Sequence, residues 1–168
     1  SFELAVVVDK EAVSYVSIPY GAVSLAEKFN AHDKISAQDL FKFYRFVLYK
    51  FRQLPWLLQG TKLPLVLLGG ANRTVARKEL MRLGRKDLEN IHGVSMSAYS
   101  FIETYTEWLG MDCKERADIL GPEAERADII IAGLSPIMFL IEYLQTPEII
   151  FSESGVREGV LYSMLKRK

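Results

Sequence analysis

The residues best suited to chemistry lie in the segment LVLLGGANRTVARK, residues 65–78. An apolar run precedes Gly69 and Gly70, and a polar segment with Arg73 and Arg77 follows them. Glycines let an anion approach backbone N–H groups, a helix N-terminus carries partial positive charge, and arginine offers a forked set of donors to phosphate oxygens. The segment therefore indicates a phosphate site. Two alternatives stay open: the glycines would also suit an ordinary turn, and Arg77 a solvated surface position.

A second candidate group stands at the first residues, SFELAVVV. Alternation along a strand places Ser1, Glu3, Ala5 and Val7 on one face, so a carboxylate lies beside a hydroxyl. Such a pair could orient water or hold Mg²⁺ near phosphates. Glu3 could otherwise be an exposed carboxylate without a chemical role.

The segment SESGVREG, residues 152–159, forms a third candidate group. A strand end meets a turn there, and a helix is expected to begin near Val156, with Arg157 in its first turn. In open α/β sheets, ligands bind outside the carboxyl ends of the strands. Two strand ends that each lead into a helix favour an anion site more than one would.

Strands and helices must alternate to position these groups. The apolar periodicity predicts a β-hairpin in residues 1–21, with Asp9, Lys10 and Glu11 as its connection, and strands at 65–68 and 148–151. Helices are expected at 21–30, from Ser36 to before Pro55, at 70–83, from Ser95 or Ser97 to 109, within 125–144 and at 156–165. This order is typical of one α/β domain over residues 1–168.

The composition excludes several classes of protein. The 168 residues are 49% hydrophobic and 25% charged, with Lys+Arg 21 against Asp+Glu 21, which argues against disorder and against a basic nucleic-acid surface. Cys113 is the single cysteine, so we expect no internal disulfide and a reducing, cytoplasmic setting. With only two histidines, a zinc site is not expected. The most apolar stretch, 129–141, is too short to cross a bilayer.

Four segments in this order resemble the exopolyphosphatase/guanosine pentaphosphate phosphatase (Ppx/GppA) family: SIPYGAVSLAEKF, NIHGVSMS, ERADIIIAG and FSESGVREGVL. The resemblance covers essentially the whole chain. It implies an α/β fold of the ribonuclease-H-like, actin/Hsp70/sugar-kinase type, with a mixed sheet flanked by helices. Residues 1–168 would be the second of two such domains, which close over a phosphate-binding cleft, with the first domain missing.

The resemblance also implies roles for individual residues. The opening SFEL looks like the tail of the family's DxGGGSxEL phosphate loop, so Ser1 would be the phosphate-binding serine. Glu3 would be the acidic residue near the metal and phosphates, with a catalytic role. Gly69, Gly70 and Arg73 would match the phosphate-binding GGTxR loop. Ala71 stands where the family usually has threonine, which removes a hydroxyl and leaves the backbone donors in place.

The implied function is a hydrolase that releases terminal phosphate from inorganic polyphosphate or from guanosine pentaphosphate with Mg²⁺ as cofactor. Water would be activated by a carboxylate of the first domain, so the isolated chain is expected to be inactive. Expected partners are those substrates, the protein's own missing N-terminal domain and, as an open alternative, a second copy in a homodimer. No nucleic acid or membrane is expected. A non-catalytic phosphate-sensing or interaction module, left open by Ala71, and a sugar-kinase fragment are the rival hypotheses.

Overall fold

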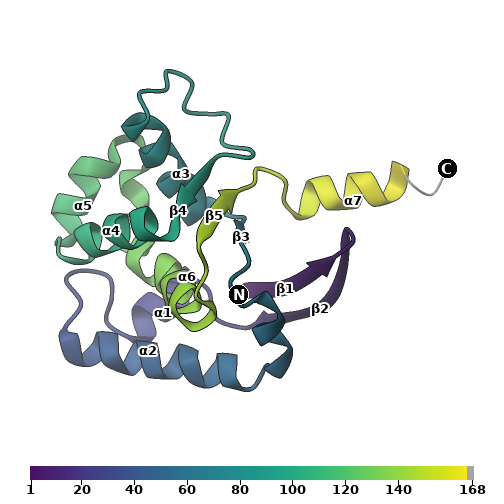
Figure 1. The fold of residues 1–168 in the computed structure, drawn as a ribbon. Coiled ribbons are helices and arrows are strands. Elements are labelled where there is room, and N and C mark those ends of the chain that lie inside the picture. Colours follow the sequence, from purple (N-terminus) through teal and green to yellow (C-terminus); the bar gives the residue numbers. More distant parts are fainter. Residues whose placement is uncertain (166–168) are drawn as a thin grey trace.

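The computed structural model describes residues 1–165, and of Val156 and Arg157 the backbone alone. The strands are β1 (Phe2–Val8), β2 (Glu11–Ile18), β3 (Leu65–Leu67), β4 (Ser95–Ser97) and β5 (Glu148–Phe151). The α-helices are α1 (Ala22–Lys28), α2 (Ala37–Arg52), α3 (Gly70–Arg82), α4 (Ala98–Leu109), α5 (Cys113–Leu120), α6 (Ile130–Leu144) and α7 (Val156–Leu165). Two 3₁₀ helices, η1 (Pro55–Gly60) and η2 (Gly121–Arg126), complete the described chain (Figure 1).

The predicted hairpin is present as the antiparallel pair β1–β2. Asp9 and Lys10 form its turn with φ angles of 49° and 69°. Positive φ at both central residues matches the right-handed twist of the flanking strands. Glu3 pairs with Ser17 across the ladder, and Val6 lies buried on the opposite face, so the expected alternation of β1 is confirmed as far as Val6. The register shifts between Val6 and Val7, and Val7 and Val8 are both exposed.

A second, three-stranded sheet has the order β3–β5–β4. Strand β3 runs parallel to β5, whereas β4 is antiparallel to it, so the sheet is mixed and the α/β class is confirmed. The hairpin forms a separate two-stranded sheet. Strand β4 was not expected; it precedes α4, whose N-cap is Ser97.

Helix α6 lies at the centre of the molecule and packs against α1, α2, α3 and α4 (Figure 1). It separates a core under the three-stranded sheet from a core under α1 and α2. The helix expected within 125–144 is present, and it continues through Pro136. Gly133 allows close packing, because a Cβ there would lie 3.3 Å from the Cβ atoms of Ala22 and Ala71.

Side-chain caps define several helix boundaries. Ser36 accepts a hydrogen bond from the Asp39 N–H at the start of α2, as its position predicts. Gly84, with φ 68°, follows the end of α3, a position where glycine is favoured. Helix α5 was not predicted, although Asp112 and Glu115 form a reciprocal capping box at its start.

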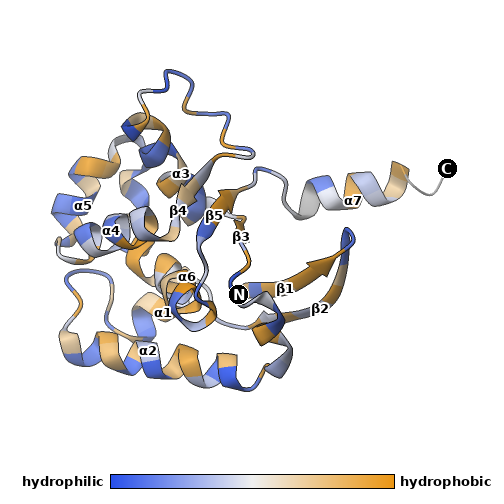
Figure 2. Cartoon of the chain, viewed as in Figure 1, coloured by the Kyte–Doolittle hydropathy of each residue, from blue (hydrophilic) through white to orange (hydrophobic). Residues whose placement is uncertain are grey.

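Apolar residues do not all lie inside the two cores. Figure 2 shows hydrophobic segments along α7 and along the hairpin, both of which extend from the body of the molecule. Within residues 1–165, no single helix is long and apolar enough to cross a membrane. Two consecutive helical segments, Cys113–Arg126 and Ile130–Leu144, reach the required length and composition only when they are taken together, and the chain bends by 95° between them.

Candidate functional site

The two predicted strand ends meet at one edge of the three-stranded sheet. Strands β3 and β5 are parallel, so their carboxyl ends lie together, and the Ser152 N–H extends the ladder by donating to the Leu67 carbonyl at 3.0 Å. Gly69 follows β3 with φ 109° and ψ 171°, a conformation essentially restricted to glycine. This geometry turns the chain directly from β3 into α3.

The N-terminus of α3 has no side-chain cap. Its first helical hydrogen bond runs from the Arg73 N–H to the Gly69 carbonyl at 3.2 Å. The N–H groups of the preceding residues in the first turn therefore have no acceptor within the helix. Together with the positive end of the helix dipole, they provide donors suited to an anion.

Arg126 covers the first residue of α3. A Cβ built on Gly70 would lie 2.5 Å from Nη1, 2.9 Å from Cζ and 3.0 Å from Nη2 of Arg126. The absent side chain of Gly70 thus makes room for a guanidinium group. Arg126 is partly buried, and within residues 1–165 it forms no hydrogen bond or ion pair with a carboxylate.

Arg73 and Arg77 have different environments. Arg77 donates to Glu89 at 2.8 Å and also pairs with Glu123, so it braces α3 rather than remaining a solvated surface charge. Arg73 is exposed and has no partner within the described part of the chain. It lines an open pocket of about 200 Å³ together with Arg77, Glu89, Ile91 and Glu153.

Ser1 and Glu3 contact each other, as the sequence predicts. The Ser1 hydroxyl donates to Glu3 Oε1 at 2.5 Å, and the Ser17 hydroxyl donates to the same oxygen at 3.1 Å. The two hydroxyls fix the orientation of the carboxylate. Its other oxygen, Oε2, has no hydrogen-bond partner among the described residues and faces solvent.

Close packing connects this carboxylate to the glycine loop through small residues. A Cβ on Gly21 would lie 3.1 Å from the Ser1 backbone nitrogen, so Ser1 sits directly against the start of α1. The next residue, Ala22, meets Gly133 of α6, and Gly133 meets Ala71 of α3. The Ser1–Glu3 pair and the loop at Gly69 and Gly70 are thus neighbours across α6. No hydrogen bond within residues 1–165 joins Glu3 to that loop.

The packing also shows what replaces the usual threonine. Ala71 turns its side chain toward Gly133 rather than away from the helices. The methyl group therefore contributes to the contact between α3 and α6. The absent hydroxyl leaves the uncapped N–H groups of α3 unchanged.

The described acidic side chains do not form a metal site by themselves. Within residues 1–165, no three His, Cys, Asp or Glu side chains come together in a group that could hold a metal ion. Mg²⁺ usually keeps several waters and binds through one or two carboxylates plus substrate phosphates. Glu3, with one unengaged oxygen, fits that mode of binding but not a cage made of protein ligands alone.

Sequence reasoning missed Arg126, since nothing in ERADIIIAG shows that this arginine reaches Gly70. Cys113 is partly buried, and its N–H donates to Asp33 Oδ1 at 2.6 Å at the start of α5. The side chain of Arg157 lies outside the described residues. The phosphate-binding roles of Ser1, Gly69, Gly70 and Arg73 and the catalytic role of Glu3 remain predictions.

Comparisons with known proteins place this geometry in a wider group. A model of the Ppx/GppA phosphatase family matches residues 1–168. No curated protein matches the chain. A Ppx/GppA family member from Aquifex aeolicus superimposes with a TM-score of 0.82 at 24% identity, over 98% of this chain and 53% of that one.

Two further solved structures are similar. The type II variant of the Aquifex aeolicus Ppx/GppA phosphatase gives a TM-score of 0.80 at 25% identity, over 96% of this chain and 52% of that one. An exopolyphosphatase from Cytophaga hutchinsonii gives 0.82 at 22% identity, over 98% and 53%. The chain thus spans about half the length of the solved structures that it matches, and it corresponds to their C-terminal half.

Proposed function

Because the chain belongs to the Ppx/GppA phosphatase family, we propose that it supplies the phosphate-binding half of an enzyme that hydrolyses terminal phosphoanhydrides. The substrate is inorganic polyphosphate or guanosine pentaphosphate. The other half is the protein's own N-terminal domain, and the enzyme works in the cytoplasm. The solved structures of about twice the length, one of them an exopolyphosphatase, support this proposal.

The observation that carries the proposal is positive charge at the start of α3, where no carboxylate of the described residues forms an ion pair with Arg73 or Arg126. The uncapped helix N-terminus, Arg73 and Arg126 lie together at the loop that joins β3 to α3. Cations are unfavourable near a helix N-terminus, so this arrangement is stabilised when an anion binds. A terminal phosphoryl group carries the charge and the several acceptor oxygens that such a set of donors requires.

The remaining residues position the reaction. The backbone N–H groups of α3, Arg73 and Arg126 hold the phosphate oxygens and stabilise the charge that develops on them. Glu3, fixed by Ser1 and Ser17, orients water at the neighbouring face. When bound, Mg²⁺ would neutralise charge on the phosphates, and Glu3 is the residue that would hold it.

Substitution of Glu3 in the longer protein tests this proposal. Glu3→Gln keeps the hydrogen-bond acceptor and removes the charge, so phosphate release should fall about 10²–10⁴-fold while substrate binding is retained. Glu11→Gln, at the far end of the hairpin, serves as the matched control and should leave turnover unchanged. Turnover that is equal in both variants would exclude a role for Glu3.

The two substrates can be separated by competition. Phosphate release from a mixture of polyphosphate and guanosine pentaphosphate, with each product quantified, gives the ratio of their kcat/KM values. The substrate with the higher kcat/KM is the preferred one. The same preparation, passed over a calibrated sizing column, shows whether the enzyme is a monomer or a homodimer.

A phosphate-sensing module without catalysis is the rival function. Its supporting feature was Ala71, but that side chain packs on Gly133, so the missing hydroxyl does not favour sensing over hydrolysis. If the longer protein binds both ligands and neither the wild type nor Glu3→Gln releases phosphate, the sensing function replaces the proposed one.

A further inference from the structure

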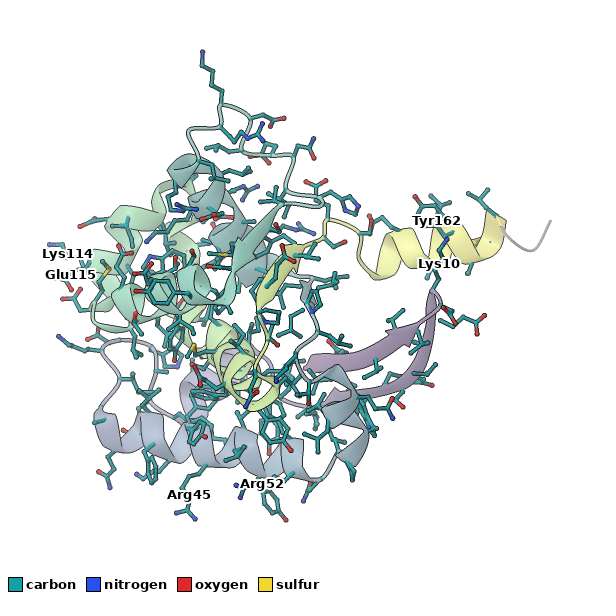
Figure 3. All side chains as sticks on the ribbon, viewed as in Figure 1. Lys10, Arg45, Arg52, Lys114, Glu115 and Tyr162 are labelled. Atoms are coloured by element: carbon teal, nitrogen blue, oxygen red, sulfur yellow. The ribbon has the colours of Figure 1, made fainter. Side chains whose placement is uncertain are left out.

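Helix α7 is the most exposed regular element of the chain. It extends away from the body, as does the hairpin, and Lys10 and Tyr162 mark these two extensions in Figure 3. All of its described side chains, from Glu158 to Leu165, are exposed. Val160, Leu161, Met164 and Leu165 are between 54% and 65% exposed.

The spacing of these four residues defines a surface. Positions i, i+1, i+4 and i+5 lie on one side of an α-helix, so Val160, Leu161, Met164 and Leu165 form one apolar stripe, the α7 stripe. A helix of ten residues is marginal in water by itself and depends on tertiary contacts along its apolar face. No element of residues 1–165 covers the α7 stripe, so the stability of helix α7 requires a partner that packs on this stripe.

We propose that the α7 stripe is a docking surface for the N-terminal half of the longer protein; this inference rests on the proposed function. The matched structures are about twice the length of this chain, which corresponds to their C-terminal half. The additional polypeptide therefore precedes Ser1. Figure 1 shows the N-terminus beside β1, at the base of the hairpin, which extends from the body on the same side as α7.

Docking on α7 also fixes one wall of the phosphate site. The segment 152–155 joins β5 to α7 and is braced at several points. Glu158 accepts from the Gly155 N–H at 2.6 Å, the Ser152 hydroxyl accepts from the Ser154 N–H at 3.2 Å, and Glu153 accepts from the Ile91 N–H at 3.3 Å. Glu153 and Arg73 line the same pocket. A partner that holds α7 thus orders the loop opposite Arg73.

Hydrogen exchange of the α7 amides tests the inference. In the longer protein, the amides of residues 160–165 should exchange about 100-fold or more slowly than in the 168-residue chain. Leu161→Glu places a charge in the α7 stripe and should remove this protection. Phe41→Glu, which changes an equally exposed apolar residue on α2, is the matched control and should preserve it.

Each outcome supports or overturns the inference. Equally fast exchange in the two wild-type proteins overturns it without reference to any variant. Protection in the 168-residue chain that rises with concentration would assign the α7 stripe to a second copy and also overturns it. Phosphate release is measured on the same samples: protection without hydrolysis refutes the proposed function alone, whereas hydrolysis without protection refutes the docking surface alone.

Discussion

At the scale of single residues, the contact between Arg126 and Gly70 is the main feature of the candidate site. The guanidinium lies against the one residue of the first turn of α3 that has no side chain, and it has no carboxylate partner among the described residues. Its position near the uncapped N–H groups is unfavourable until an anion arrives. The affinity of the chain for a phosphate chain should therefore depend on Arg126.

Arg126→Gln should weaken the binding of tripolyphosphate to the 168-residue chain about 10–100-fold, because a hydrogen bond to a charged group contributes about 1.5–3 kcal/mol. Isothermal titration calorimetry at low salt measures the effect. Arg45→Gln removes the same charge from the outer face of α2, which Figure 3 shows far from α3, and should leave the affinity nearly unchanged. Equal losses in the two variants would indicate non-specific electrostatics.

The two glycines of the loop should respond differently to alanine. Gly69→Ala forces a side chain into a conformation with φ 109° and should lower the free energy of unfolding by about 1–3 kcal/mol. Gly70→Ala lies in a helix with ordinary φ, so stability should be kept, but the new methyl group displaces Arg126 and weakens tripolyphosphate binding. Thermal unfolding and calorimetry on both variants separate the two effects. A stable Gly69→Ala variant would contradict the first expectation.

The residues of the candidate site were only partly predictable from sequence. Gly69, Gly70 and Arg73 stand in a local order that itself indicates an anion site, and Ser1 and Glu3 share a face by strand alternation. Arg126 is 56 residues beyond Gly70 in the sequence, and only the packing of η2 against α3 brings the two together. Arg77 looked available and is used in ion pairs.

At the scale of elements, α4 and α6 are joined by a buried polar contact. The Tyr105 hydroxyl lies 2.8 Å from Ser135 Oγ, which itself donates to the Ile131 carbonyl at 2.7 Å, so Tyr105 is the donor of the pair. Burial raises the pKa of Tyr105 to about 12. The folded state therefore holds the phenol proton in a pH range where the unfolded chain releases it.

This shift predicts a loss of stability in alkali. A folded pKa above the unfolded value of about 10 gives stability that is complete below pH 10 and falls as the pH rises to about 12, by an amount on the order of 2–3 kcal/mol. Tyr105→Phe should cost about 0.5–1.5 kcal/mol at neutral pH through the lost hydrogen bond, and its stability should fall less steeply above pH 10. Urea unfolding at pH 8 and pH 11 measures both. Parallel curves for the two proteins would exclude this role of Tyr105.

Elements with local determinants were predicted well. The hairpin, β5 and α7 follow from alternation and apolar spacing, and α2 and α4 begin at serine caps. Strand β4 has three residues and exists only because it pairs with β5, so no local pattern indicates it. Helix α5 could have been found, because the Asp112–Glu115 spacing is that of a capping box.

At the scale of the whole molecule, the α/β class and the single chain-wide family match agree with what the sequence indicated. The separation into a two-stranded and a three-stranded sheet could not be read from the sequence, because strand order depends on contacts between distant segments. The exposed α7 stripe belongs to the same scale. Its pattern is visible in the sequence, but its lack of cover is a property of the folded chain.

Catalysis is also a property of the whole molecule. The described residues provide an anion site and one oriented carboxylate, but no second acidic group stands beside Glu3. Phosphoryl transfer depends on positioning and on electrostatic stabilisation from all sides of the phosphate, so one wall of the cleft should bind without turnover. The 168-residue chain should therefore bind tripolyphosphate yet release no phosphate from long-chain polyphosphate with Mg²⁺, beyond the rate of its Glu3→Gln variant. Phosphate release by the chain at a rate comparable to that of the longer protein would show that the first domain is not needed for the chemistry.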